Sequence, residues 1–222
     1  QYSAQDSGTL SIATTHTQAR YVLPGPVAAL RQAYPKVAVS LHQGSPDQVA
    51  KMLIEETAEI GMATESLLNY PELVTLPCYE WQHVLVLPFD HPLAQRERIS
   101  LEDLAQVPLV TYHPSFTGRT RIDQAFALRH LQPNIVLEAI DSDVIKTYVK
   151  LGMGVGIVAE MAMQGENATP DLVARPAAQL FGHNLARVAF KRGTYLRHFV
   201  LRFAELLSDR LSRDLILQAM AG

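Results

Sequence analysis

The sequence predicts an α/β fold built around parallel sheets. Short apolar runs, typical of buried strands, alternate with segments whose apolar residues recur at helical spacing. The order strand, helix, strand, helix, strand occurs in residues 9–63 and starts again in residues 109–159. Because parallel strands need a crossover connection, usually a helix, this order indicates two βα units, each with a parallel sheet.

The first unit begins with a strand predicted over Thr9–Thr14. The following helical pattern meets the sequence Pro-Gly-Pro at residues 24–26, so we expect a kinked helix or two helices. Gly-Ser-Pro at residues 44–46 is typical of a turn followed by a helix N-cap and first helical residue. The other predicted elements are the strand Val37–Leu41, the helix Val49–Glu56 and the strand Ile60–Ala63.

Two apolar stretches on either side of Gln82 are predicted as separate strands that lead to the second unit. A long final helix is expected over Tyr195–Met220, because its apolar residues form a helical stripe. The strands predicted from residue 73 onward are Leu73–Trp81, His83–Leu87, Leu109–Thr111, Ile135–Ala139, Val155–Ala159, Leu172–Ala174 and Arg187–Phe190, and the helices between them are Thr117–Leu131 and Asp143–Leu151.

Composition excludes several classes of protein. The chain has 222 residues, 48% of them hydrophobic, which is enough for one large or two small domains without disulfides or metals. The one cysteine, Cys78, cannot pair within the chain, which favours a reducing compartment and thus the cytoplasm. The net charge of −3 argues against binding of nucleic acid by charge.

No apolar run approaches the roughly 20 residues of a membrane helix, so no membrane association is expected. Residues 1–8 are polar and lack both Met and the apolar core of a signal peptide. We therefore expect the chain to be a soluble fragment of a longer protein.

The sequence offers no convincing catalytic or metal centre. His16 lies beside hydroxyl residues, but no nucleophile-elbow motif is present, and Cys78 lies in an apolar strand. The eight histidines lack metal-ligand spacing. The glycines of residues 152–156 follow a helix and precede a strand, the reverse of a dinucleotide-binding fingerprint, and indicate a helix C-cap and turn. We predict no catalytic residue, no metal and no cofactor.

Polar residues gather where predicted strands end and helices begin, at residues 14–18, 43–45 and 115–120. In parallel sheets these junctions lie at the carboxyl ends of strands, where ligands bind and helix N-termini attract anions. Neutral hydroxyl and amide donors there would hold an anion reversibly. The alternative is that Thr17, Ser45 and Thr117 are ordinary helix caps, worth about 1 kcal/mol each, and for any one residue alone this alternative is simpler.

Tyr79 and Trp81 alternate on one predicted strand and so face the same side. They form either an aromatic wall for a small ligand or part of the core. Asp141 and Asp143 begin a predicted helix, where capping is the first interpretation.

The string T-T-H-T-Q-A-R-Y at residues 14–21 resembles the effector-binding domain of LysR-type transcriptional regulators, in the CysB and Cbl branch that controls sulfur assimilation. D-V-I-K-T-Y-V at residues 143–149 is likewise specific to that branch. Shorter matching strings are H-Q-G-S-P at 42–46, L-P-C-Y at 76–79 and F-T-G-R at 116–119, and the likeness extends from about Gly8 to the C-terminal helix.

The resemblance implies two Rossmann-like subdomains joined by two crossover strands, as in periplasmic binding proteins, with the effector in the cleft between them. Subdomain I would comprise residues 1–82 and 184–222, and subdomain II residues 83–183. The helix-turn-helix DNA-binding domain of the family would precede Gln1 and is absent from this chain.

The resemblance also implies a set of ligand-binding residues. Its anion-binding positions and its cavity-lining aromatic residues carry over to this chain, and residues of the strand–helix junctions described above complete the predicted set. In that order, the residues are Thr15, Thr17, Gln18, Thr64 and Thr117, then Tyr79 and Trp81, then Gln43, Ser45 and Gly118. The implied effectors are O-acetylserine or N-acetylserine, with sulfate or thiosulfate as opposing or alternative anions.

The function implied is that of a sensor and dimerisation domain without catalysis. The family forms homodimers of this domain and homotetramers of the full-length protein, and promoter DNA would be bound only through the missing N-terminal domain. Two alternatives stay open. One is a periplasmic oxyanion-binding protein for transport, and the other is an enzyme on the same fold, for which His16 is the one obvious titratable candidate.

Overall fold

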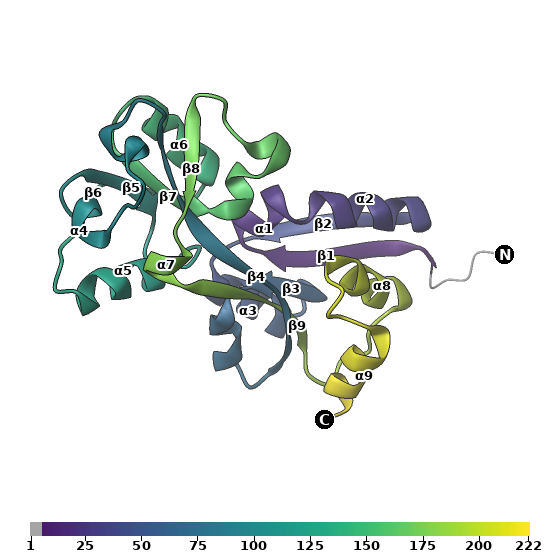
Figure 1. Cartoon of the computed structure of the whole chain (residues 1–222). Coiled ribbons are helices and arrows are strands. Elements are labelled where there is room, and N and C mark those ends of the chain that lie inside the picture. The colour runs from purple at the N-terminus through teal and green to yellow at the C-terminus, as the bar shows by residue number, and fades with distance from the viewer. Residues whose placement is uncertain (1–5) are drawn as a thin grey trace. The chain divides into compact units, whose positions relative to one another are not determined.

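The computed structural model describes residues 6–222, which form two α/β units (Figure 1). The first unit extends to Glu80 and resumes at Leu185–Gly222, and the second comprises Trp81–Asn184. These limits lie within two residues of the predicted ones, while residues 1–5 of the predicted subdomain I lie outside the described residues. The predicted α/β fold is confirmed. Strands β4 (Leu73–Pro88) and β9 (His183–Lys191) carry the chain from one unit to the other.

The sheet of the first unit has the strand order β2-β1-β3-β9. Strand β1 pairs in parallel with both β2 and β3, as predicted, and β9 returns antiparallel to β3. The predicted break at the prolines divides the first helix into α1 and α2. The elements of the N-terminal segment are β1 (Gly8–Thr14), α1 (His16–Tyr21), α2 (Pro24–Ala33), β2 (Val37–Gln43), α3 (Pro46–Ile54), β3 (Ile60–Ala63) and the 3-10 helix η2 (Glu65–Asn69).

Alternation along β1 builds a core on each face of this sheet. Leu10 and Ile12 join a buried cluster with Leu30 of α2 and with the C-terminal helices, whereas Ala13 points into a second cluster with Val49 of α3. Successive strand residues point to opposite faces, so α2 and α3 cover opposite sides of the sheet. The C-terminal segment, yellow in Figure 1, lies beside the purple N-terminal strands and helices and completes the first cluster.

The sheet of the second unit has the order β4-β7-β5-β6, and β8 pairs with β4. Strand β5 is parallel to β6 and β7, and β4 is antiparallel to β7 and β8. The remaining strands are β5 (Pro108–Tyr112), β6 (Asn134–Ala139), β7 (Val155–Ala159) and β8 (Leu172–Pro176). The helices are η3 (Pro92–Gln95), α4 (Leu101–Leu104), α5 (Arg119–Leu128), α6 (Ser142–Lys150), η4 (Glu160–Met163), η5 (Gly165–Asn167) and α7 (Ala178–Phe181).

Two predictions about long elements were wrong. Strand β4 continues through Gln82, whose polar side chain did not end the strand. The final helix is two helices, α8 (His198–Leu207) and α9 (Arg213–Ala221). Between them Ser208 adopts an extended conformation and its hydroxyl donates to the carbonyl of Cys78 at 2.5 Å. Ser212 then caps α9 by accepting from the amide of Leu215 at 3.1 Å.

The predicted C-cap interpretation of the glycine string fits the structure. Helix α6 ends at Lys150, its C-cap is Leu151, and Gly152 follows at a φ of 81°, a left-handed conformation that favours glycine. The amide of Gly152 donates to Val149 and that of Met153 donates to Tyr148, the two bonds of a Schellman motif. No helix in residues 6–222 is long and apolar enough to cross a membrane.

Gly154, just before β7, is required by close packing. A Cβ atom at this residue would lie 2.6 Å from the carbonyl oxygen of Pro108, a backbone atom at the start of β5. We expect Gly154→Ala to lower the free energy of unfolding by about 1–3 kcal/mol, because paired β5 and β7 must separate. Urea denaturation measures the change.

Gly25 in α2 is the matched control, since a Cβ atom there would meet nothing within 4 Å. Gly25→Ala should leave stability unchanged or raise it by up to about 1 kcal/mol. Equal effects of the two substitutions would contradict this account of Gly154.

The Cys78 thiol is buried, and burial raises its pKa to about 12. The thiolate is the reactive form, so we expect the folded protein to react slowly with a disulfide reagent at about pH 8 and quickly in denaturant. A spectrophotometric thiol assay reads this residue alone, because the chain has one cysteine. Rapid stoichiometric labelling of the folded protein would contradict the prediction.

Candidate functional site

The strand ends of the first unit bring most of the predicted ligand-binding residues to one edge. Thr14 at the end of β1 pairs with Gln43 of β2 and with Met62 of β3. Because all three strands run in parallel, their carboxyl ends share an edge of the sheet. The predicted residues at or just after these strand ends are Thr15, Thr17, Gln18, Gln43, Ser45 and Thr64.

The chain changes direction at β1. It crosses to β2 through α2 on one face of the sheet and crosses from β2 to β3 through α3 on the other. In open α/β sheets, the crevice at the carboxyl ends of the strands next to such a reversal is where ligands bind. The residues beside it are those after β1 and β3, whereas Gln43 is the last residue of the outer strand β2 and Ser45 follows that strand.

Thr15, Thr17 and Gln18 are buried polar residues at the start of α1. Thr15 is the N-cap residue, but its side chain makes no capping hydrogen bond, and Thr17 lies inside the helix. The interpretation of Thr17 as an N-cap is therefore wrong. Since α1 has only six residues, side-chain donors matter more here than the helix dipole.

Tyr79 orients Gln18. The Tyr79 hydroxyl donates to Gln18 Oε1. The oxygen of the carboxamide is thus engaged, and Nε2 remains as its donor. Burial raises the pKa of Tyr79, so the phenol stays protonated and keeps its role as a donor.

Ser45 and Thr64 have local partners. Ser45 is the N-cap of α3 in a capping box, in which its hydroxyl accepts from the amide of Gln48 and its own amide donates to Gln48 Oε1. The capping interpretation of Ser45 is therefore confirmed. Thr64 is the N-cap of η2, with its hydroxyl 2.9 Å from that of Ser66. Gln43 is exposed.

In the second unit, Thr117 and Gly118 form a left-handed turn before α5. Their φ angles are 46° and 71°, and Gly118, not Thr117, is the N-cap. The helix begins two residues later than predicted, and the capping interpretation of Thr117 is wrong. A threonine in this conformation costs about 1–3 kcal/mol and persists only when its surroundings hold it. Such strain is often found at ligand sites.

His83 of β4 holds this turn. Its ring Nε2 lies 2.8 Å from the carbonyl oxygen of Thr117, which can only accept, so Nε2 carries the proton. Burial lowers the pKa of His83 to about 4 against the opposing effect of that bond. Trp81, the predicted aromatic residue two positions earlier, is buried and packs edge-on to His83, with ring centroids 4.9 Å apart.

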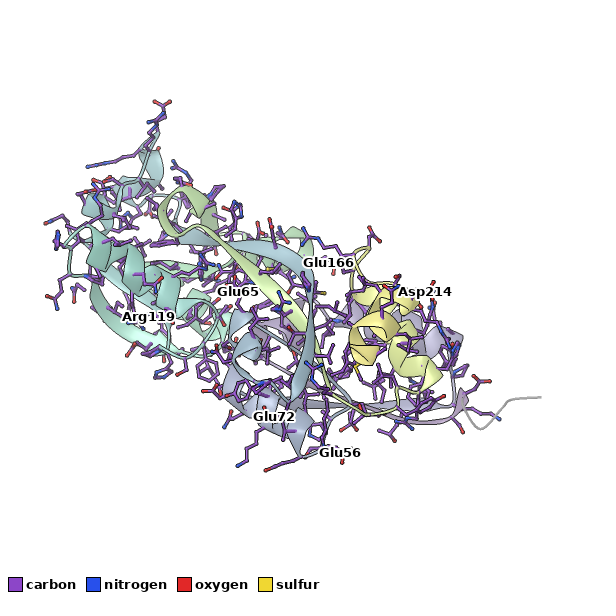
Figure 2. The ribbon with its side chains drawn as sticks, turned by 90° about the horizontal axis from the view of Figure 1, so that it is seen from below. Glu56, Glu65, Glu72, Arg119, Glu166 and Asp214 are labelled. Carbon is purple, nitrogen blue, oxygen red and sulfur yellow. The ribbon has the colours of Figure 1, made fainter. Side chains whose placement is uncertain are left out.

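Arg119, labelled in Figure 2, is the first residue of α5. It is not a free anion clamp. Its Nε donates to Asp123 at 2.8 Å, and its Nη1 donates to Glu138 and to the carbonyl of Tyr112. Two carboxylates therefore balance its charge. Neutral donors remain the predicted means of holding an anion near Thr117.

Sequence reasoning missed His83 and Asn184, which both lie against Gly118. No motif or spacing pointed to them, because they come from strands far from Thr117 in the sequence. In residues 6–222, no group of three or more His, Cys, Asp or Glu could hold a metal ion.

An α/β fold with polar donors at parallel strand ends defines a class of small-molecule-binding domains. Within this class, residues 3–212 match the family model of the LysR substrate binding domain, and the chain belongs to this family.

The chain is similar to named regulators. It is 54% identical over 221 residues to the HTH-type transcriptional regulator CysB of Burkholderia cenocepacia, covering 100% of this chain and 70% of that protein. It is 47% identical over 211 residues to the regulator cbl of Escherichia coli, covering 95% of this chain and 66% of that protein. The crystal structure of the cofactor-binding domain of the Cbl transcriptional regulator superposes with a TM-score of 0.91 at 46% identity, covering 97% and 95% of the two chains.

The lowered pKa of His83 makes stability depend on pH. The unfolded chain binds a proton on this residue below its ordinary pKa of 6.5, whereas the folded protein does so only near 4. The unfolded state thus binds more protons between these values, and stability falls as the pH falls through this range. We expect a loss on the order of 3 kcal/mol at about pH 4 relative to about pH 7.

His83→Gln should remove this part of the pH dependence, because glutamine does not titrate. Urea denaturation at several pH values, with His113→Gln at an exposed position as the control, measures it. The same pH dependence in wild type and His83→Gln would contradict the assignment.

Proposed function

We propose that this chain is the effector-sensing domain of a LysR-type regulator of sulfur assimilation and cysteine biosynthesis genes. Its effectors would be O-acetylserine or N-acetylserine and oxyanions such as sulfate or thiosulfate. The observation that carries the proposal is the buried set Thr15, Thr17 and Gln18 beside the reversal of the first sheet. These neutral donors suit a carboxylate or an oxyanion that must also leave.

A second set of donors supports the same proposal. Thr117 is buried in a left-handed turn at the N-terminus of α5, where backbone amides add a partial positive charge. In the set of the first unit, Thr64 follows the end of β3, and Tyr79 takes part through its hydrogen bond to Gln18. Trp81 and Gly118 join Thr117 in the set of the second unit. Gln43 and Ser45, beside the outer strand, are the weakest members.

The proposed partners follow from the relatives, whose names describe HTH-type transcriptional regulators. We assign promoter DNA to a helix-turn-helix in the part of such proteins that this chain does not cover. Homodimers of this domain, homotetramers of the full protein and a cytoplasmic location complete the proposal. The predicted alternatives of a transport protein and an enzyme gain no support from these relatives.

Removal of one donor should weaken anion binding. We expect Gln18→Ala and Thr117→Ala each to raise the Kd for sulfate by about 5- to 30-fold, equivalent to about 1–2 kcal/mol. Isothermal titration calorimetry with sulfate, thiosulfate and the two acetylserines measures the affinities.

The controls are Gln179→Ala and Thr147→Ala, at exposed positions of the second unit. They should leave every Kd unchanged. A folded wild-type protein that binds none of the four compounds would overturn the proposed function.

A further inference from the structure

Three polar side chains of the second unit are buried, yet each has a nitrogen without a hydrogen-bond partner among the described residues. Trp81 is 2% exposed, His83 0% and Asn184 6%, and the nitrogens are Nε1, Nδ1 and Nδ2 respectively. One unpaired buried polar atom costs about 1–3 kcal/mol, and such atoms are rare in folded proteins. Three in one unit indicate an occupant that pairs them.

His83 and Asn184 lie against Gly118 of the Thr117–Gly118 turn, and Trp81 packs on the ring of His83. A Cβ atom on Gly118 would be 2.7 Å from Asn184 Oδ1 and 2.8 Å from His83 Cε1. Asn184 Nδ2 shares its carbon atom with Oδ1, and His83 Nδ1 is bonded to Cε1. Both unpaired nitrogens therefore lie near Gly118. The Trp81 ring meets the His83 ring edge-on at 4.9 Å. Because residue 118 is a glycine, no Cβ atom blocks the approach of His83 and Asn184 to the turn.

Each of the three unpaired nitrogens can be assigned as a hydrogen-bond donor or acceptor. His83 Nε2 donates to the carbonyl of Thr117, so Nδ1 of the neutral ring is an acceptor. Its lowered pKa keeps the ring neutral near pH 7. Trp81 Nε1 and Asn184 Nδ2 are donors. The cluster therefore offers two donors and one acceptor.

We propose that Trp81, His83 and Asn184 form a subsite that binds the amide group of an N-acylated amino acid. The amide carbonyl would accept from the two donors, and the amide N–H would donate to His83 Nδ1. This inference rests on the proposed function, because the subsite adjoins Thr117 of the proposed effector site.

Other groups fit this cluster less well. A sulfate dianion only accepts, so it would leave His83 Nδ1 unpaired and facing negative charge. An ammonium group only donates, so it would leave Trp81 and Asn184 unpaired. An internal water could pair with all three nitrogens, and the experiment separates this case from a ligand subsite.

A matched pair of ligands tests the role of His83 without any mutation. The probes are N-acetyl-L-serine and its ester analogue 2-acetoxy-3-hydroxypropanoate, in which oxygen replaces the amide N–H. Calorimetry should show the wild type binding the amide about 10-fold or more tightly, because the analogue leaves Nδ1 unpaired. Equal affinities would overturn the proposal.

His83→Gln completes the test, since glutamine can still donate to the Thr117 carbonyl but lacks the Nδ1 acceptor. In this variant the preference for amide over ester should disappear, while the Kd for sulfate stays within about twofold. His113→Gln should keep the preference. An unchanged preference in a folded His83→Gln protein would overturn the proposal.

Asn184→Leu, which preserves size and removes the donor, should weaken the amide and the ester alike by about 5- to 10-fold, with sulfate unaffected. Asn134→Leu, exposed at the start of β6, is the control. If Asn184→Leu raised the Kd of the amide, the ester and sulfate equally, the role of Asn184 would be structural and the proposal would be overturned. If it raised none of them, the unpaired nitrogens would be assigned to an internal water, which also overturns the proposal. Failure of the wild type to bind both sulfate and N-acetylserine would overturn the proposed function itself.

Discussion

The parallel pairing of β1 with a strand on each side is the constraint on which the candidate site depends. It sends one crossover helix over each face of the first sheet and leaves the strand ends open at one edge. The strand pairing alone brings together the polar residues that follow these strands. The buried hydroxyls and amide at the start of α1 lie at that edge, which is where ligands bind in open α/β sheets.

The proposed donor side chains in both units are neutral. Arg119, the cation nearest the Thr117–Gly118 turn in sequence, is already paired with two carboxylates. Tyr79 stays a phenol because burial raises its pKa, and His83 stays a neutral imidazole because burial lowers its pKa. A site of this kind gains about 0.5–1.5 kcal/mol per hydrogen bond, which suits a sensor whose ligand must dissociate.

The elements that follow local patterns were predictable from the sequence, and those that depend on distant contacts were not. Strand and helix order followed from periodicity, and Ser45-Pro46 marked the start of α3. The end of α8 was missed because Ser208 bonds to Cys78, a residue remote in sequence. The partners Gln18 and Tyr79, and Thr117 and His83, meet only in the folded chain. Apart from the glycine that follows it, nothing in the sequence indicated that Thr117 adopts a left-handed conformation.

The division of the chain also bears on how the protein folds. The second unit is one continuous segment, inserted between two parts of the first. It can complete its contacts as soon as Asn184 has been synthesised. The first unit must wait, because β9 pairs with β3 and the C-terminal helices fill its core only after that segment has emerged. Contacts of such long sequence separation slow folding, so the inserted unit should acquire its structure first.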